Sequence, residues 1–373
     1  MAFEGASMKA IVGAVIVMMA FVSGANSVMA AQCTPFGDSP AKVNHGWFAS
    51  FLSRHTPLCR RGIVLGPWKD PSGQNRYACL YVPAYAGKEN PLPLIVFLHG
   101  SVATADSVSF TGLSDLVGKA DLGGVRPGFI LLAPQGRYTS HFYPGFDSDA
   151  FGWDNWYRQL SPSGAVTVDG TTYPENADAA SIDHFVSEQL ATGEVDSRRI
   201  YMMGWSNGAA MAILYALNRP SIAAAAVYSA PDPFGAFFDV CPQIPIAGIA
   251  SGIGQLHVFN PRVPVMHVRN ACDIGGICPN GTRLAVRLRA MGGNVEDIIL
   301  DASRKTVASC DDNCGIDPMG DGQVSEIAAL QGFWHHARWP TAWNDKMLSF
   351  LKQHPIESTP VPQGAVMPRP PAK

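Results

Sequence analysis

The chain has 373 residues, of which 47% are hydrophobic and 15% are charged, and its formal net charge is −3. About 25% of the residues of a typical soluble domain are charged, so this surface is weakly charged. The sequence contains no run of Lys and Arg that would favour nucleic acid, and no acidic tail that would favour a basic partner. This composition suits an uncharged ligand.

The first predicted element is an export signal. An apolar run over residues 10–22 follows Met8-Lys9, and small residues follow it up to Ala31. The run is 13 residues long, whereas spanning a bilayer takes about 20. We therefore expect residues 1–30 to be a cleaved signal peptide, with a periplasmic or secreted protein and no stable membrane insertion. An uncleaved anchor is the alternative.

The cysteines predict disulfides. Their number is eight, which is even, and exported proteins form disulfides. The close pairs are Cys272/Cys278 and Cys310/Cys314, which leaves four others to pair among themselves: Cys33, Cys59, Cys79 and Cys241. Zinc at Cys310-x3-Cys314 is the alternative, but no second Cys/His pair stands at finger spacing. We expect no metal and no cofactor.

Short apolar runs alternate with helical patterns along the chain. The runs predict strands at 77–82, 93–98, 128–133, 199–204 and 263–268, and helices at 176–191, 207–217, 281–291 and 342–353. Continuous apolar runs are typical of strands that are buried on both faces. The alternation predicts an α/β fold with a mainly parallel central sheet flanked by helices. One catalytic domain is expected over 31–354, followed by a Pro-rich disordered tail over 355–373.

Residues 138–173 form a long connection that is rich in aromatic residues, Gly and Asp. A connection of this length is either functional or flexible, and we expect it to fold over one side of a cleft. Trp153 and Trp156 lie in it, and both are candidates for binding a substrate. Trp205 and Trp334 are further candidates. The alternative for each side chain is simple packing.

Residues 204–208 read Gly-Trp-Ser-Asn-Gly, which is a G-x-S-x-G motif between a predicted strand and a predicted helix. This context is the nucleophile elbow of α/β-hydrolases, in which a sharp turn projects the serine hydroxyl above the sheet. Ser206 is therefore the candidate nucleophile. The elbow needs an oxyanion hole, and its backbone donors are expected from Asn207 and from Ser101 or Val102 after an upstream buried strand.

In this fold the acid and then the base follow the serine along the chain. Asp273 follows the strand predicted at 263–268, and Asp232 is the second choice for the acid. The base is expected near the C-terminus, on a loop before the last helix. His336 is the better candidate, and its neighbour His335 is the alternative.

Four segments then carry a family resemblance: 98–100 (L-H-G), 182–186 (I-D-H-F-V), 195–201 (V-D-S-R-R-I-Y) and 204–209 (G-W-S-N-G-A). Together they resemble the polyhydroxybutyrate depolymerase and feruloyl esterase group, which includes oxidised polyvinyl alcohol hydrolase. The resemblance covers about residues 77–353. The ending His336-x-x-Trp339-Pro340 is similar to the family's H-x-W-P with one residue inserted. The resemblance implies the α/β-hydrolase fold and a triad of Ser206, Asp273 and His336.

Three functions follow as hypotheses. The first is an exported, monomeric serine hydrolase that cleaves an uncharged ester, in a polymer or a polymer-derived compound, through an acyl-enzyme. The second keeps the nucleophile but hydrolyses a carbon–carbon bond of a β-diketone. The third is a non-catalytic binding protein on a hydrolase scaffold, against which the complete set of triad candidates argues.

Overall fold

The computed structural model describes residues 56–71, 73–142, 146–153, 166–168, 171–173, 176–233, 260–274, 277–311 and 326–357, and two short strands at 33–34 and 37–38. The chain divides into two units, Met1–Ala31 and Gln32–Lys373, and every described residue belongs to the second. The predicted signal peptide and most of the predicted tail lie outside the described residues. No described helix is long and apolar enough to cross a membrane.

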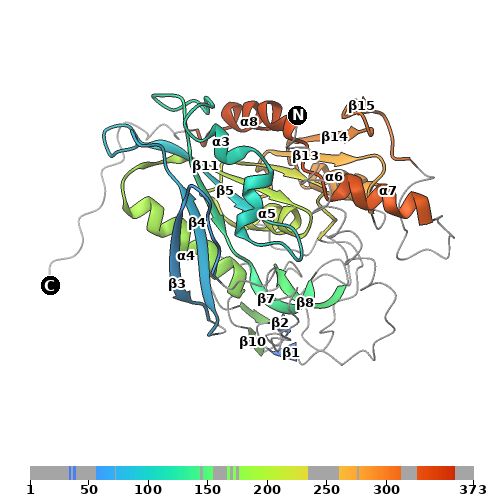
Figure 1. The fold of residues 1–373 in the computed structure, drawn as a ribbon, viewed down its shortest axis with the longest axis horizontal. Coiled ribbons are helices and arrows are strands. Elements are labelled where there is room, and N and C mark those ends of the chain that lie inside the picture. The colour runs from blue at the N-terminus through green and yellow to red at the C-terminus, as the bar shows by residue number, and fades with distance from the viewer. Residues whose placement is uncertain are drawn as a thin grey trace, which may run out of the picture. The chain divides into compact units, whose positions relative to one another are not determined.

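A nine-stranded sheet forms the centre of the second unit, in the order β15-β14-β13-β12-β11-β5-β6-β4-β3 (Figure 1). Its strands are β3 (Ile63–Lys69), β4 (Asn75–Tyr81), β5 (Leu92–Leu98), β6 (Ile130–Pro134), β11 (Val195–Trp205), β12 (Ala224–Tyr228), β13 (Val265–Asn270), β14 (Val295–Leu300) and β15 (Thr306–Val307). Six neighbouring strands, from β6 through β5 and β11 to β14, are parallel. The pairs β3–β4, β4–β6 and β14–β15 are antiparallel, so in this sheet β4 and β15 run opposite to the other strands.

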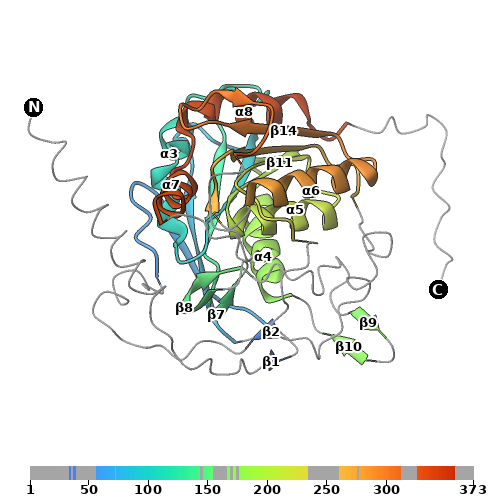
Figure 2. The same ribbon diagram turned by 90° about the vertical axis from the view of Figure 1, so that its right-hand side faces the viewer.

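Helices cover both faces of this sheet. The described elements are η1 (Ala105–Phe110), α3 (Leu113–Leu116), α4 (Ala177–Ala191), α5 (Asn207–Asn218), α6 (Ile277–Ala290), α7 (Glu326–His336), η5 (Thr341–Trp343) and α8 (Asn344–Gln353). Figure 2 shows α4, α5 and α6 on one side of the sheet and α3 and α8 on the other. The short hairpins β1–β2 (Cys33–Thr34, Gly37–Asp38), β7–β8 (Arg137–Phe142, Phe146–Gly152) and β9–β10 (Val166–Val168, Thr171–Tyr173) lie outside it.

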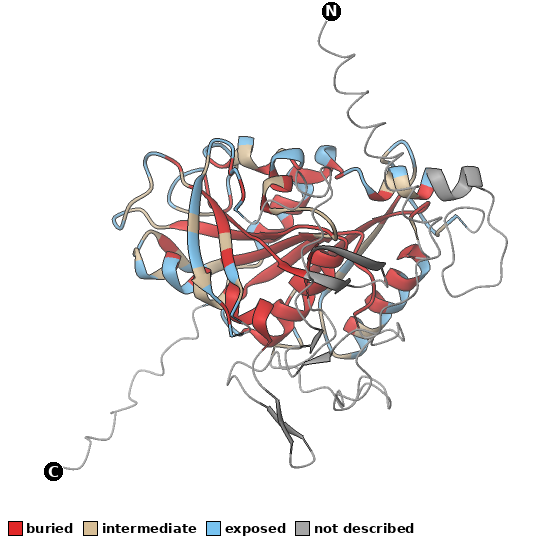
Figure 3. Ribbon diagram, turned by 60° about the horizontal axis from the view of Figure 1, so that its bottom comes forward, coloured by how far each residue is buried: buried red, intermediate tan, exposed pale blue. Residues whose placement is uncertain are grey.

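Alternate residues of each central strand serve the two faces. Leu94 and Val96 of β5 belong to the core under α4, α5 and α6, whereas Ile95 and Phe97 belong to the core under η1, α3 and α8. Every residue of β5 is therefore buried, as are those of β6, β12 and β13 (Figure 3). This two-sided burial explains why these strands are continuous apolar runs rather than alternating ones.

The predicted α/β-hydrolase fold, with its mainly parallel sheet and flanking helices, is confirmed. All five predicted strands and all four predicted helices are present. The pattern missed four large elements: β3, β12, β14 and α7. β3 and β14 are partly exposed and lie toward the sheet's edges, so they lack a continuous apolar run.

The sequence does not fix the disulfide connectivity, and the structure does not pair the cysteines that lie close together in the chain. Cys278, in α6, is bonded to Cys310, which follows β15, so neither Cys272/Cys278 nor Cys310/Cys314 is a disulfide. The same bond excludes Cys310 as a zinc ligand. Cys59 is bonded to Cys79. Cys272 is also disulfide-bonded.

A buried ionic cluster ties β4 to the start of α4. Arg76, which is 1% exposed, donates to Asp70 over 2.8 Å and pairs with Asp178 at the N-terminus of α4. Its guanidinium also donates to the Gln135 carbonyl over 3.2 Å. Arg137, the first residue of β7, lies 3.8 Å from Asp178. The two ends of the aromatic connection, at β7 and α4, therefore meet at one buried carboxylate. Removing one partner from such a cluster typically costs about 3–5 kcal/mol.

Candidate active site

The G-x-S-x-G motif forms a sharp turn between β11 and α5. Ser206 has φ 56° and ψ −121°, a strained backbone for a residue other than glycine. A Cβ on Gly208 would lie 2.2 Å from the His99 carbonyl oxygen, and one on Gly204 would lie 2.5 Å from the Gly208 carbonyl oxygen. Both flanking positions must therefore be glycine, because the turn presses strand and helix backbones together. This turn carries the Ser206 side chain out beyond the carboxyl end of β11.

Three predicted residues meet there through two short hydrogen bonds. The Ser206 hydroxyl lies 2.8 Å from Nε2 of His336, and Nδ1 of His336 lies 2.7 Å from Oδ1 of Asp273. Ser206 and Asp273 follow β11 and β13, while His336 comes from more than sixty residues further along the chain. The structure brings His336, and not His335, to Ser206.

The hydrogen bonds determine which atoms carry protons. An ionised carboxylate only accepts, so the bond to Asp273 places a proton on Nδ1 of His336 and leaves Nε2 free to accept the Ser206 proton. His336 is the last residue of α7, and a helix C-terminus stabilises positive charge. The site therefore favours the imidazolium that forms when His336 takes that proton. The loop expected around this histidine is in fact the end of a helix.

Side chains from the sheet hold the end of α7. The indole of Trp205 donates to the His336 carbonyl over 2.8 Å, and the hydroxyl of Tyr228 donates to the His335 carbonyl over 2.7 Å. Arg304 donates to the Tyr228 hydroxyl over 3.1 Å and to the Arg338 carbonyl over 2.8 Å. The last carbonyls of a helix have no partner within it, and here those of His335 and His336 find donors in β12 and β11, while Arg304 holds the segment just after the helix.

Asp273 is buried and accepts on both carboxylate oxygens. Oδ1 also accepts the Ile274 backbone N–H over 2.8 Å, and Oδ2 accepts the Ser229 hydroxyl over 2.7 Å. Sequence reasoning missed Ser229, because a single Ser after a strand carries no signal. The second-choice acid, Asp232, lies elsewhere: its carboxylate is 3.3 Å from Arg287.

The oxyanion-hole candidates lie on both sides of Ser206. Asn207 is the first residue of α5, so its backbone N–H has no acceptor within the helix. The Val102 N–H donates to the Phe151 carbonyl over 2.9 Å. That bond engages the Val102 amide, which was the alternative to Ser101 as the second donor.

Trp153 links Asn207 of the nucleophile elbow to His99, which lies two residues before the oxyanion-hole candidate Ser101. The Asn207 side chain accepts from the Trp153 N–H over 2.7 Å and donates to its carbonyl over 3.3 Å, while the Trp153 indole donates to the His99 carbonyl over 2.8 Å. Trp153 is 0% exposed. Its expected role in binding substrate is therefore corrected, because its side chain packs inside the protein and supports the site.

The other tryptophan candidates differ in exposure. Trp205 is partly buried, and its indole N–H is engaged by His336. Trp156 lies outside the described residues. Trp334 is 42% exposed on α7, so among the described tryptophan candidates its side chain is the most accessible to solvent.

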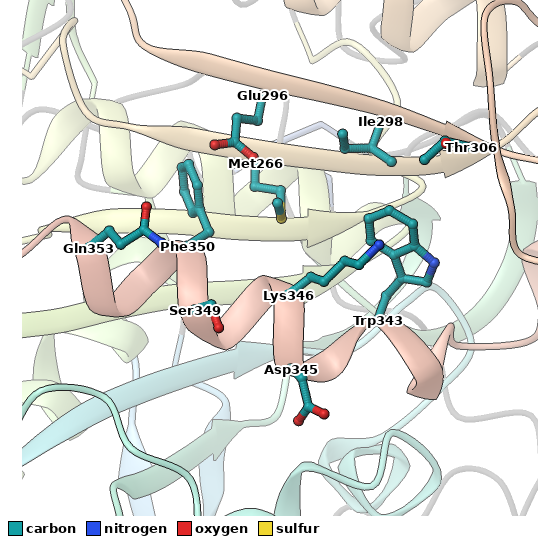
Figure 4. A pocket seen from close by; sticks show the side chains of 10 residues that line it. All are labelled: Met266, Glu296, Ile298, Thr306, Trp343, Asp345, Lys346, Ser349, Phe350 and Gln353. Carbon is teal, nitrogen blue, oxygen red and sulfur yellow. The ribbon is translucent and has the colours of Figure 1, made fainter.

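A pocket of about 470 Å³ lies away from these groups, between α8 and strands β13 and β14 (Figure 4). Its lining includes Met266, Glu296 and Phe350, and Lys346 sits 3.9 Å above the ring of Trp343. None of the triad candidates lines it, so we assign it no part in the chemistry.

His99 is a neutral structural histidine beneath the oxyanion loop. Its Nε2 accepts the Gly136 N–H over 2.9 Å, so Nδ1 carries the proton and donates to the Gly100 carbonyl over 2.7 Å. Burial lowers the pKa of His99 to about 4. The unfolded chain binds a proton here near pH 6.5, and the folded protein does so only near pH 4. The contribution of neutral His99 to the free energy of unfolding is fully present above pH 6.5 and is lost as the pH falls from 6.5 to 4.

We therefore expect the free energy of unfolding to drop by about 3 kcal/mol on this account between pH 7 and pH 4. Urea unfolding across this range measures it. The variant His99→Gln keeps an acceptor for the Gly136 N–H but does not titrate. The free energy of unfolding should therefore depend less on pH in this variant than in the wild type. His184→Gln, on a partly exposed histidine of α4, is the control for replacing a histidine with glutamine. A slope unaffected by His99→Gln would contradict the assignment.

The sheet order, the elbow and the serine, histidine and aspartate at its carboxyl edge define an α/β-hydrolase. Residues 76–240 match the family described as esterase PHB depolymerase, which confirms the resemblance seen in the motifs over that part of the chain. The matched residues include the elbow and the oxyanion-hole candidates and end before Asp273 and His336. This match supports a hydrolase of the esterase type.

Three solved structures are similar to the chain. One is described as a thermostable esterase (17% identity, TM-score 0.48), and the alignment covers 80% of this chain and 64% of that one. A second is a ferulic acid esterase (13%, 0.46), with 78% and 98% covered. A third is the apo form of Thermogutta terrifontis esterase 2 (14%, 0.44), with 79% and 93% covered. A search of the curated proteins gives no match.

Proposed function

We propose that this protein is an exported serine hydrolase that cleaves carboxylic esters with Ser206, His336 and Asp273. The observation that carries the proposal is the unbroken chain of hydrogen bonds from the Ser206 hydroxyl through both nitrogens of His336 to Asp273. A nucleophile, its base and a group that orients the base are the minimum for acyl transfer by a serine. The esterase PHB depolymerase match supports the ester as the bond attacked.

The steps follow from the proton positions. His336 Nε2 takes the Ser206 proton as Oγ bonds to the ester carbonyl carbon, and the N–H groups of Asn207 and Ser101 stabilise the oxyanion. The imidazolium then gives its proton to the leaving alkoxide, which departs as an alcohol. Water attacks the acyl-enzyme by the same route in reverse, which releases the acid and restores Ser206. Asp273 remains ionised throughout.

The substrate we propose is uncharged and includes a polymer or a polymer-derived ester. The weakly charged chain supports this class, as does Trp334, an aromatic residue that is exposed on α7. Disulfides such as Cys59–Cys79 and Cys278–Cys310 support export, because they persist in an oxidising compartment.

Turnover of two substrates by the same preparation tests the bond that is cleaved. We expect a short-chain nitrophenyl ester to be hydrolysed with kcat/KM on the order of 10⁴ M⁻¹s⁻¹ or more, in the ordinary range for enzymes. A small β-diketone, which would yield an acid and a methyl ketone, should turn over far more slowly. Acid release, measured by pH-stat, reports both reactions in the same way.

A faster reaction with the diketone would contradict ester hydrolysis as the main activity and would make the protein a carbon–carbon bond hydrolase. No turnover of either substrate, together with no labelling by a fluorophosphonate probe, would instead indicate a binding protein on a hydrolase scaffold.

A further inference from the structure

The carboxylate of Asp273 is fully buried, and its two oxygens have different partners. Oδ1 faces His336 and also accepts the Ile274 N–H, whereas Oδ2 accepts the hydroxyl of Ser229. The Ser229 hydroxyl is thus the donor on the side of the carboxylate that turns away from the imidazole. A buried carboxylate needs donors on both oxygens if it is to keep one orientation.

Ser229 is itself held firmly at the centre of the site. It directly follows β12, is 0% exposed, and its backbone N–H donates to the Val268 carbonyl of β13 over 2.8 Å. The preceding carbonyl, that of Tyr228, accepts the Ser206 N–H over 2.9 Å. The adjacent residues Tyr228 and Ser229 therefore contact the nucleophile and the acid, respectively.

The backbone of Ser229 is in the left-handed region, with φ 54°. Non-glycine residues adopt this conformation at a cost, and such residues concentrate at active sites. Glycine would adopt it more easily, but glycine has no hydroxyl. The serine at this position is therefore best explained by what its side chain donates.

We propose that Ser229 is a positioning residue, whose hydroxyl holds the Asp273 carboxylate so that Oδ1 stays aligned with Nδ1 of His336. This inference rests on the proposed triad. Without the hydroxyl, Oδ2 is left buried without that donor, and the carboxylate gains by rotating toward another one. Rotation weakens the bond to His336, which then loses its orientation toward Ser206.

Two variants separate the effect of losing the Ser229 hydroxyl from the effect of the strained backbone at this position. Ser229→Ala removes the hydroxyl and keeps the strain, while Ser229→Gly removes both. We expect each to lower kcat for the short-chain ester by about 10- to 100-fold, because a buried hydrogen bond to a charged group is lost. KM should stay within about twofold, since the hydroxyl acts on Asp273 and not on the substrate. Ser181→Ala is the control, because the Ser181 hydroxyl on α4 is also buried and has no hydrogen-bond partner among the described residues.

A spectroscopic readout checks the mechanism independently of turnover. The proton between His336 and Asp273 is expected to give a low-field NMR signal, which should move upfield or broaden in both Ser229 variants and stay in place in Ser181→Ala. Thermal unfolding of each variant establishes that it is folded, and glycine keeps the test usable if alanine is not tolerated at φ 54°.

Two results would overturn the inference. Wild-type kcat in both variants would show that the hydroxyl is not needed, and wild-type kcat in Ser229→Gly alone would show that strain in the alanine variant caused its loss. Either result leaves the proposed function intact as long as Ser206→Ala is inactive. Full activity of Ser206→Ala would overturn the triad itself, whatever the Ser229 variants do.

Discussion

Replacing Ser206 with alanine is expected to lower kcat/KM for a short-chain nitrophenyl ester by on the order of 10⁴-fold or more. The change removes the only atom that bonds to the carbonyl carbon in the proposed mechanism. It leaves the rest of the site in place, because the Ser206 backbone bond to the Tyr228 carbonyl does not involve the hydroxyl. Residual turnover would come from the oxyanion hole and binding alone.

Two measurements make this result specific. Ser197→Ala, an exposed serine at the other end of β11, is the matched control and should keep wild-type activity. A fluorophosphonate probe should add its mass to the wild-type peptide that contains Ser206 and to no peptide of Ser206→Ala. Undiminished hydrolysis by a folded Ser206→Ala variant would rule out this serine as the nucleophile.

Replacing His336 or its neighbour His335 with alanine should lower kcat to very different extents, with losses that differ by several orders of magnitude. His336→Ala removes the base that accepts the Ser206 proton and is expected to lower kcat by on the order of 10⁴-fold or more. His335→Ala should stay within about tenfold of wild type, because the contact that links His335 to Tyr228 uses its backbone carbonyl, which alanine retains. Steady-state kinetics of the two variants at pH 8 gives the comparison.

The pair also tests the geometry of the helix end. Both variants keep the carbonyls that Trp205 and Tyr228 bind, so α7 should end at the same place and thermal stability should change little. A large loss in His335→Ala with full activity in His336→Ala would reverse the assignment. The one-residue insertion before Trp339 and Pro340 would then have shifted the base to the earlier histidine.

Sequence predicted most of the fold that local pattern determines. Most central strands are buried on both faces, so apolar runs such as 93–98 mark them, although β12 was missed. The elbow was predictable because close packing of β11, α5 and β5 demands glycine at two positions that flank one serine. Asp273 could be chosen because in this fold the acid follows a strand after the elbow, and β13 was the next strand that the pattern predicted.

What escaped prediction depends on contacts between distant residues. Helix α7 ends at His336 with no Gly or Pro directly after it, since side chains of β11 and β12 supply its last carbonyls with donors. The Cys278–Cys310 bond joins residues 32 positions apart that meet where α6 and the end of β15 come together. Ser229 is one serine among many until the backbone brings it to Asp273.

The anchoring of Trp153 and of α4 has a consequence for protein engineering. Trp153 is fixed by Asn207 and His99, and α4 begins with an Asn176 cap and an Asp178 that pairs with Arg76. The chain between these two fixed points can therefore be treated as a cassette. Transplanting the corresponding stretch of a related hydrolase between positions 153 and 176 would leave both anchors in place, together with the groups that we propose do the chemistry.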